Sequence, residues 1–157
     1  GGLVQAEVAA CMVEMMLPGQ HYALGAGTTV AAVMAALQLS NTLLGFDIVC
    51  DGRCIASDVS AAELEQWAAR VELTVIITPT GGQGSLIGRG NQQLSPVLLH
   101  HLGRERIWVL ATRSKLSALA GRPLRLDTGD AELDRAWSGW WSIHSGYQQQ
   151  LLYAVQG

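Results

Sequence analysis

The residues best suited to ligand chemistry are concentrated in one glycine-rich segment, TPTGGQGSLIGRGNQQ, at residues 78–93. Amide and guanidinium groups suit phosphate and hydroxyl oxygens, and glycines let a backbone adopt positive φ and approach a ligand closely. The polar side chains are those of Gln83, Arg89, Asn91, Gln92 and Gln93, and the glycines are Gly81, Gly82, Gly84, Gly88 and Gly90. We expect this segment to bind a ligand. Glycine-rich loops also serve as plain connectors, and the sequence leaves both interpretations open.

A second candidate loop is GAGTT at residues 25–29. It follows a short strand candidate at 21–24 and precedes an alanine-rich helix expected over 30–39. A strand, a glycine turn with hydroxyls and a helix N-terminus together form an arrangement in which backbone N–H groups hold an anion. We expect a phosphate on the backbone from Gly25 to Thr29. The simpler alternative is that Thr28 or Thr29 serves only as the helix N-cap.

Acidic residues are missing from the principal loop, since no Asp or Glu lies between Glu72 and Glu105. The loop therefore offers donors and amides but no carboxylate for general acid–base catalysis, which favours binding over catalysis.

Lys115 is the only lysine of the chain and follows a strand expected at 107–111. It could therefore reach an anion held by the loops; the alternative is that its side chain is solvated. Asp47 and Asp51 are the acids expected nearby. The expected ligand-binding set is Gly25, Gly27, Thr28, Thr29, Asp47, Asp51, Gly81, Gly82, Gln83, Gly84, Arg89, Gly90, Asn91, Gln92 and Lys115.

Helices and strands alternate along the rest of the chain. Helices are expected at 4–17, 60–70, 96–102, 114–119 and 131–137, and strands at 43–49, 54–56, 75–77, 124–126, 140–144 and 151–155. Ser60 and Glu63 form a capping box, Ser95-Pro96 is a helix-start signal, and Asp51-Gly52 is typical of a hairpin turn. The pattern predicts a single α/β domain over residues 1–157, in three layers, with a mostly parallel, Rossmann-like sheet.

The amino-acid composition limits the classes of function that this chain could have. The chain has 157 residues, 49% of them hydrophobic, and a net charge of -3, which gives no reason to bind nucleic acid or an anionic membrane. No apolar run approaches the roughly 18–20 residues of a membrane span, so we expect a cytoplasmic protein. Because the chain has three cysteines, an odd number, we expect them to be free thiols, and we expect no metal site. Because Gly1 stands in place of Met, we expect a fragment of a longer protein.

Four segments together resemble the C-terminal domain of the ATP-NAD/AcoX-type kinase family, which comprises predicted NAD kinases. They are GAGTT, TLLGFDIVCDG, IITPTGGQGSLIGRGNQQLSP and VLATRSKLSAL-GRPLRLDTGDAELD, and the resemblance extends from about Val4 to Val155. It implies that the kinase machinery, with its GGDGT signature, lies in an N-terminal domain, which would be the partner of this chain. It further implies that the whole protein phosphorylates the adenosine ribose of NAD, using ATP, NAD and a divalent metal.

A second resemblance concerns the fold. GAGTTV, the Asp-Gly pair, the glycine-rich loop and the SKL segment are similar to the ribose-5-phosphate isomerase and sugar-phosphate-binding fold. The catalytic pattern of that family has a lysine before its glycine run and a glutamate after it. Here Thr80 precedes Gly81-Gly82 and no glutamate follows, so Lys115 alone matches an active-site position.

The sequence therefore predicts the C-terminal ligand-binding domain of an ATP-dependent NAD kinase, which holds a phosphorylated sugar or nucleotide in its glycine-rich loops. No residue of this chain is expected to be catalytic, so the chain alone is expected to be inactive. One alternative is a sugar-phosphate isomerase-like enzyme. Another is a regulatory or oligomerisation module, in which Trp137, Trp140 and Trp141 form a contact in a homo-oligomer.

Overall fold

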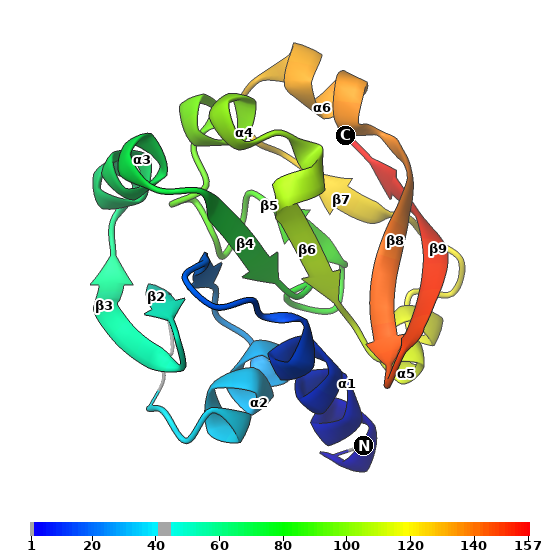
Figure 1. The fold of residues 1–157 in the computed structure, drawn as a ribbon. Coiled ribbons are helices and arrows are strands. Elements are labelled where there is room, and N and C mark those ends of the chain that lie inside the picture. Colours follow the sequence, from blue (N-terminus) through cyan, green and yellow to red (C-terminus); the bar gives the residue numbers. More distant parts are fainter. Residues whose placement is uncertain (1, 41–44) are drawn as a thin grey trace.

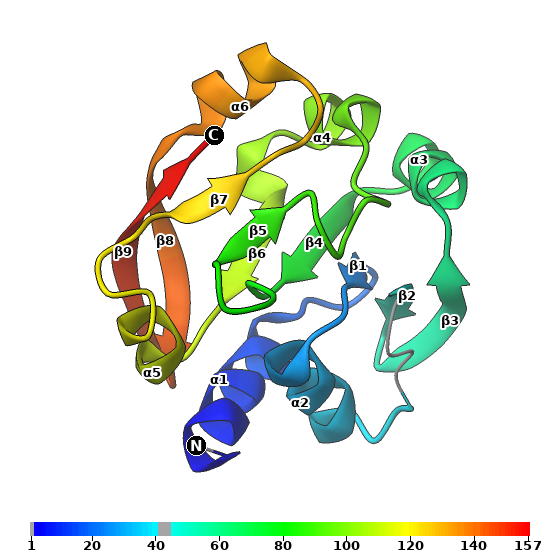
Figure 2. The same cartoon turned by 180° about the vertical axis from the view of Figure 1, so that it is seen from behind.

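The chain forms an α/β domain with a mostly parallel sheet, as predicted (Figures 1 and 2). Within the residues that the structure describes, the sheet has nine strands and is accompanied by six α-helices. The computed structural model describes residues 2–40 and 45–157. The elements are α1 (Gly2–Met15), β1 (His21–Leu24), α2 (Thr28–Ala36), β2 (Phe46–Cys50), β3 (Arg53–Val59), α3 (Ala61–Arg70), β4 (Leu73–Ile77), β5 (Ser85–Ile87), α4 (Pro96–Leu102), the 3-10 turn η1 (Arg104–Arg106), β6 (Ile107–Leu110), α5 (Arg113–Ser117), β7 (Leu124–Leu126), α6 (Ala131–Trp137), β8 (Gly139–Gly146) and β9 (Gln149–Gln156).

The strand order is β3-β2-β1-β4-β6-β8-β9-β7-β5. Strands β1, β4, β6 and β8 are parallel neighbours, whereas the β2–β3 and β8–β9 pairs are antiparallel hairpins. The Asp-Gly signal correctly predicted the first hairpin, since Asp51 and Gly52 take φ of 51° and 72° in its turn. Among the described residues, no helix has the length and apolar character needed to cross a bilayer.

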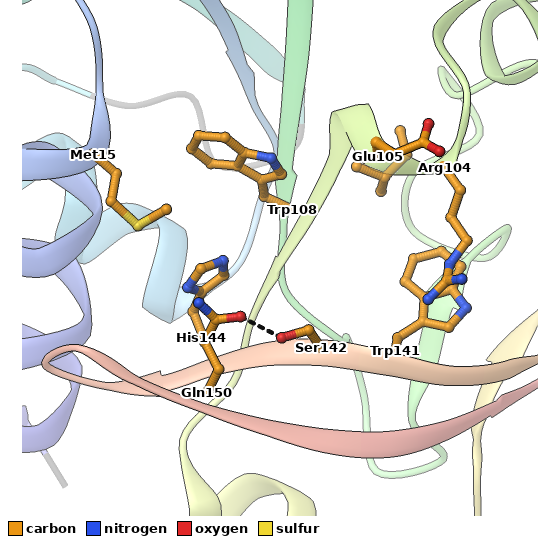
Figure 3. Close-up of a pocket in the computed structure, with 9 residues that line it drawn as sticks. Met15, Arg104, Glu105, Trp108, Trp141, Ser142, His144 and Gln150 are labelled. Atoms are coloured by element: carbon orange, nitrogen blue, oxygen red, sulfur yellow. Dashed lines mark hydrogen bonds between the residues drawn. The ribbon is translucent and has the colours of Figure 1, made fainter.

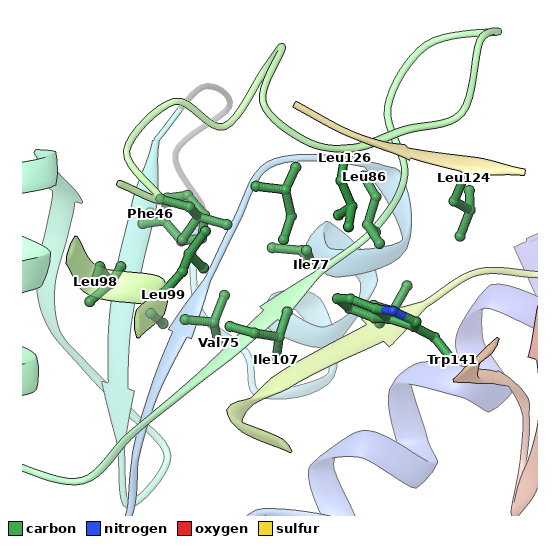
Figure 4. Packing of buried hydrophobic residues seen from close by; sticks show 14 of the residues in the cluster. Phe46, Val75, Ile77, Leu86, Leu98, Leu99, Ile107, Leu124, Leu126 and Trp141 are labelled. Carbon is green, nitrogen blue, oxygen red and sulfur yellow. The ribbon is translucent and has the colours of Figure 1, made fainter. Parts of the chain in front are cut away.

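The sheet separates two hydrophobic cores, and alternate residues of each central strand face opposite sides. In β4, Ile76 faces α1 and α2, while Val75 and Ile77 face the core shared with α3 and α4. On that second side the sheet curls back, so that side chains of β5 and β7 pack across β4 (Figure 4). Leu86 and Leu124 are fully buried there.

Several helix boundaries follow the local signals in the sequence. Ser60 accepts a hydrogen bond from the Glu63 amide and completes the expected capping box of α3. Ser95 caps α4, which ends at Gly103. Helix α2 begins at Thr28 rather than at Val30, so it includes the two threonines of the GAGTT loop.

The largest difference from expectation lies in the principal glycine-rich segment, where strand β5 was not predicted. Leu86 and Ile87 are buried, and the strand pairs with β7 through Ser85↔Arg125 and Ile87↔Leu126. The flanking glycines hide this three-residue strand in the sequence, and its tertiary pairing stabilises it. The strand divides the segment into two separate loops. The strand expected at 43–49 corresponds to β2, which spans Phe46–Cys50. Residues 43 and 44 of the expected strand lie outside the described residues.

Candidate functional site

A pocket of about 600 Å³ opens at the C-terminal ends of β1, β4 and β6. Because these three strands are parallel neighbours, their C-terminal ends meet at one edge of the sheet, where α/β proteins commonly bind ligands. The lining residues come from α1, from the loops after the three strands and from α5. They are Gly2, Gln5, Gly27, Thr28, Thr29, Thr78, Pro79, Thr80, Gly81, Thr112, Ser114, Lys115 and Ala118.

Gly27 brings the loop after β1 into close contact with the loop after β4. Its φ is 119°, and a Cβ at this position would lie 2.3 Å from Cγ2 of Thr78. Only glycine fits both the conformation and the space. Gly27 is also the N-cap of α2, and no side chain caps this helix. The uncapped helix N-terminus therefore presents backbone N–H groups and the positive end of the helix dipole beside the pocket.

Gln5 of α1 reaches the same helix N-terminus. Its Nε2 donates to Oγ1 of Thr28 at 3.1 Å and to Oγ1 of Thr29 at 3.5 Å. The amide therefore orients both hydroxyls at the pocket wall. The sequence analysis did not include Gln5 among the candidate residues, because no local signal distinguishes it from other polar residues on a helix surface.

Lys115 lines the pocket together with residues of the loops after β1 and β4. The Thr112 hydroxyl accepts a hydrogen bond from the Lys115 backbone N–H at 3.2 Å and caps α5. The ammonium Nζ donates to the carbonyl of Gly81 at 3.4 Å. This is a long hydrogen bond, so the ammonium can exchange that carbonyl for a better acceptor without a large loss.

The pocket chemistry is dominated by hydroxyl groups. Six hydroxyl side chains line it, and none of the described lining residues carries a carboxylate. The lining hydroxyls that the sequence analysis missed are those of Thr78, Thr80, Thr112 and Ser114. Each lies within four residues of the end of β4 or β6, which was the available signal. One ammonium, one helix N-terminus and a ring of hydroxyls suit an anionic, hydroxyl-bearing ligand.

The second half of the glycine-rich segment has a structural role. Asn91 is buried: its Oδ1 accepts from the Gly88 N–H at 2.8 Å, and its Nδ2 donates to the Leu86 carbonyl at 2.7 Å. A Cβ at Gly88 would lie 2.5 Å from the carbonyl oxygen of Asp127, and one at Gly84 would lie 2.9 Å from a methyl of Leu119. Asn91 therefore closes a turn within the segment, Gly84 and Gly88 allow close packing against Leu119 and Asp127, and none of the three lines the pocket.

The remaining polar residues of that segment also lie away from the pocket. Gln83 accepts a hydrogen bond from Nη1 of Arg122 at 3.2 Å. Arg89 is exposed, and its carbonyl accepts from the Ser85 hydroxyl at 3.1 Å. Gly90 and Gln92 line a separate groove beside α3. Of the glycine-rich residues expected to bind a ligand here, only Gly81 lines the pocket; its neighbour Gly82 does not.

The two expected acids do not line the pocket. Asp47 is buried, and its Oδ1 accepts from the Asp58 N–H at 3.0 Å, which fastens β3 to β2. Asp51 lies at the opposite edge of the sheet, beside the start of β1, where it accepts from the Gly19 N–H at 2.8 Å. Gly25 extends β1 by donating to the Ile76 carbonyl, and it packs against Phe46.

The DTGD segment at 127–130 forms a helix cap. Oδ1 of Asp130 accepts from the amides of Glu132 and Leu133, and Oδ2 pairs with Nε2 of His100 at 2.9 Å. The hydrogen bond from His100, followed by that from the Leu133 amide, lowers the pKa of the Asp130 carboxyl. Thr128 donates to Asp134 at 2.6 Å and closes the turn. This motif therefore positions α6 against α4 and is remote from the pocket.

The comparisons with known proteins agree with the resemblance found in the sequence. The model of the ATP-NAD kinase C-terminal domain family matches residues 18–155. The match covers the loops after β1, β4 and β6 and leaves α1, with Gln5, outside it. No curated protein and no solved structure matches the chain, so the similarity to the ribose-5-phosphate isomerase fold stays a prediction. Since the family model matches nearly the whole length, the chain belongs to the ATP-NAD kinase C-terminal domain family.

Proposed function

We propose that this domain is the ligand-binding part of an ATP-dependent NAD kinase, and that the pocket at the ends of β1, β4 and β6 holds a phosphorylated sugar or nucleotide. The observation that carries the proposal is the convergence of the uncapped N-terminus of α2 with the ammonium of Lys115 on one hydroxyl-lined pocket. A phosphate accepts several hydrogen bonds and carries negative charge, so it matches both groups.

In this arrangement the phosphate lies against the backbone of residues 27–29. Lys115 leaves the Gly81 carbonyl, its acceptor at 3.4 Å, and pairs with a phosphate oxygen. Gln5, which already donates to the hydroxyls of Thr28 and Thr29, orients them toward the sugar or phosphate oxygens. This assignment gives the polar contacts to Gln5 and the threonines, in place of the Gln83, Arg89 and Asn91 side chains expected from the sequence.

The domain supplies binding and positioning rather than phosphoryl transfer. A kinase needs groups that hold ATP and its metal and a residue that orients the attacking hydroxyl. The described lining residues include no carboxylate for either task. We therefore assign ATP, NAD and a divalent metal to the parent protein and its N-terminal kinase domain. An isomerase would also need a base, and the same absence argues against that alternative.

The test is calorimetric titration of the purified chain with ribose 5-phosphate, NAD and ATP, with ribose as the uncharged control. We expect at least one phosphorylated ligand to bind and ribose to bind more weakly. Lys115→Ala should weaken binding about tenfold or more, because it removes a charge-assisted hydrogen bond. Arg113→Ala removes a positive charge from the same helix outside the pocket, so it is the matched control and should leave affinity nearly unchanged.

Two outcomes would oppose the proposal. One is that no phosphorylated ligand binds at about 10 mM, where a useful site would be largely filled. The other is that Lys115→Ala and Arg113→Ala weaken binding equally, which would indicate general charge attraction rather than a contact in the pocket.

A further inference from the structure

A second cleft, of about 390 Å³, lies on the α1 side of β6 and β8 and is not part of the pocket described above. It is lined by Met15, Arg104, Glu105, Ile107, Trp108, Trp141, Ser142, His144 and Gln150 (Figure 3). Helix α1 contributes Gln5 to the pocket and Met15 to the cleft, and ten residues of helix span about 15 Å. The two sites therefore lie at opposite ends of α1 and share no lining residue.

The cleft has an aromatic wall that neighbouring side chains hold in place. The ring of Trp108 lies 5.9 Å from that of Tyr22 and 6.2 Å from that of His144. Arg104 lies 4.8 Å above the Trp141 ring, and its Nη2 donates to the Trp140 carbonyl at 2.8 Å. Side chains fixed by packing lose little freedom when a ligand binds, so the cleft is preorganised.

Polar groups on this wall lack protein partners. Trp141 donates its indole N–H to the Trp137 carbonyl at 2.8 Å. In contrast, neither the Trp108 indole N–H nor the His144 ring has a hydrogen-bond partner among the described residues. Gln150 uses its Oε1 to accept from the Ser142 hydroxyl, which leaves the two N–H groups of its Nε2 for a ligand. Trp108 and His144 are half-buried and Gln150 is exposed, so a ligand can reach all three groups from the cleft.

The charges in the cleft balance. Arg104 and Glu105 carry opposite charges at one end, and burial lowers the pKa of His144, so its ring is neutral near pH 7. A neutral imidazole offers one donor and one acceptor, whereas the Trp108 indole and the Gln150 amide nitrogen offer donors only. The complementary ligand is uncharged and flat, with at least two acceptors and one further polar atom.

We propose that this cleft binds an uncharged nitrogen heterocycle of one or two fused rings, which lies edge-on to the Trp108 indole and is hydrogen-bonded to Trp108, His144 and Gln150. Ring nitrogens accept from the indole and amide N–H groups, and an exocyclic amino group pairs with the imidazole. The volume falls within the usual 300–1,000 Å³ range of small-molecule sites. Purely apolar rings of similar size leave the donors unpaired and bind more weakly.

The test follows the indole N–H resonances of the ¹⁵N-labelled chain during titration with adenine, and with benzyl alcohol as an aromatic compound without ring nitrogens. The chain has five tryptophans, and Trp108→Phe identifies the relevant resonance. We expect adenine to shift the Trp108 resonance saturably, with the largest shift among the five. Both His144→Phe and Gln150→Leu should weaken adenine binding about three- to tenfold, because each loses a hydrogen bond while keeping side-chain volume.

Trp140→Phe is the matched control, since the Trp140 side chain is 66% exposed and does not line the cleft. It should leave the adenine affinity unchanged. The proposal is overturned if adenine leaves the Trp108 resonance in place at about 5 mM, or if benzyl alcohol binds as tightly. It is also overturned if His144→Phe and Gln150→Leu, with their other indole resonances intact, both bind adenine like the parent chain.

Discussion

The contact between Gly27 and Thr78 predicts a large loss of stability for Gly27→Ala. The new Cβ would lie 2.3 Å from Cγ2 of Thr78, and the residue would have to keep a φ of 119°. The backbone at Gly27, with φ of 119° and ψ of 156°, lies in a region almost restricted to glycine, which costs about 1–3 kcal/mol for a residue with a side chain. Overpacking against a buried methyl adds about 1–3 kcal/mol. We therefore expect the free energy of unfolding to fall by about 2–6 kcal/mol, a large part of the 5–15 kcal/mol typical of a domain.

Urea denaturation of matched variants separates these two contributions. Gly52→Ala is the control for a positive φ without a steric clash, because Gly52 has a φ of 72° and a Cβ there would meet nothing within 4 Å. It should cost only about 1–2 kcal/mol. Thr78→Ser removes the methyl that the Gly27→Ala side chain would strike. Combined with Gly27→Ala, it should therefore recover about 1–3 kcal/mol relative to additivity.

The argument fails if Gly27→Ala costs no more than Gly52→Ala, because the two loops would then not be in the tight contact described. It also fails if the double variant is additive within about 0.5 kcal/mol, the usual limit for independent sites. A positive result would show that the loops after β1 and β4 form one rigid wall of the pocket.

Three further predictions concern other parts of the chain. Asn91→Ala should lower the free energy of unfolding by about 2–4 kcal/mol in urea denaturation, since the Gly88 N–H and the Leu86 carbonyl lose their buried partner; a cost below about 0.5 kcal/mol would contradict the structural role. Burial lowers the pKa of His144 in the folded chain below its ordinary value of 6.5, so the unfolded chain binds more protons and stability should fall as pH drops below 6.5. His144→Gln should reduce that fall between pH 7.5 and 5.5, and an unchanged pH profile would count against it. Finally, the purified chain should neither phosphorylate NAD nor isomerise ribose 5-phosphate, and turnover that Lys115→Ala abolishes would show that an active site was missed.

Local signals predicted most of the fold because they depend on short stretches of chain. The capping box at Ser60 and the Asp51-Gly52 turn both appear where the sequence placed them. Strand β5 was missed because its three residues become a strand only through pairing with β7, about 40 residues later in the chain. Composition and spacing describe what lies nearby in sequence and carry little information about such distant pairs.

Some of the residues expected to bind a ligand line the pocket and others do not, and the difference has a physical cause. Lys115 and the GAGTT loop line the pocket because strand ends of a parallel sheet converge at one edge. Asn91 does not, because the same amide groups that suit a ligand also suit the backbone of a buried turn. Side-chain chemistry alone cannot distinguish the two uses; burial and hydrogen-bond partners can.

The glycine-rich and DTGD motifs of this chain therefore serve mainly to stabilise its fold. The pocket is lined mainly by residues outside these motifs. Asn91 closes the turn after β5 through Gly88 and Leu86, Gly88 lets the segment approach the backbone of Asp127, and Asp130 caps α6. The polar wall of the pocket depends instead on threonines and on Gln5, which lies before the matched residues 18–155.

If Gln5 orients the hydroxyls as proposed, Gln5→Leu should weaken the binding of a phosphorylated ligand. The fold should stay intact, because the exchange preserves side-chain volume on a half-exposed helix face. Equal affinity of Gln5→Leu and the parent chain in calorimetry would confine recognition to Lys115 and the helix N-terminus.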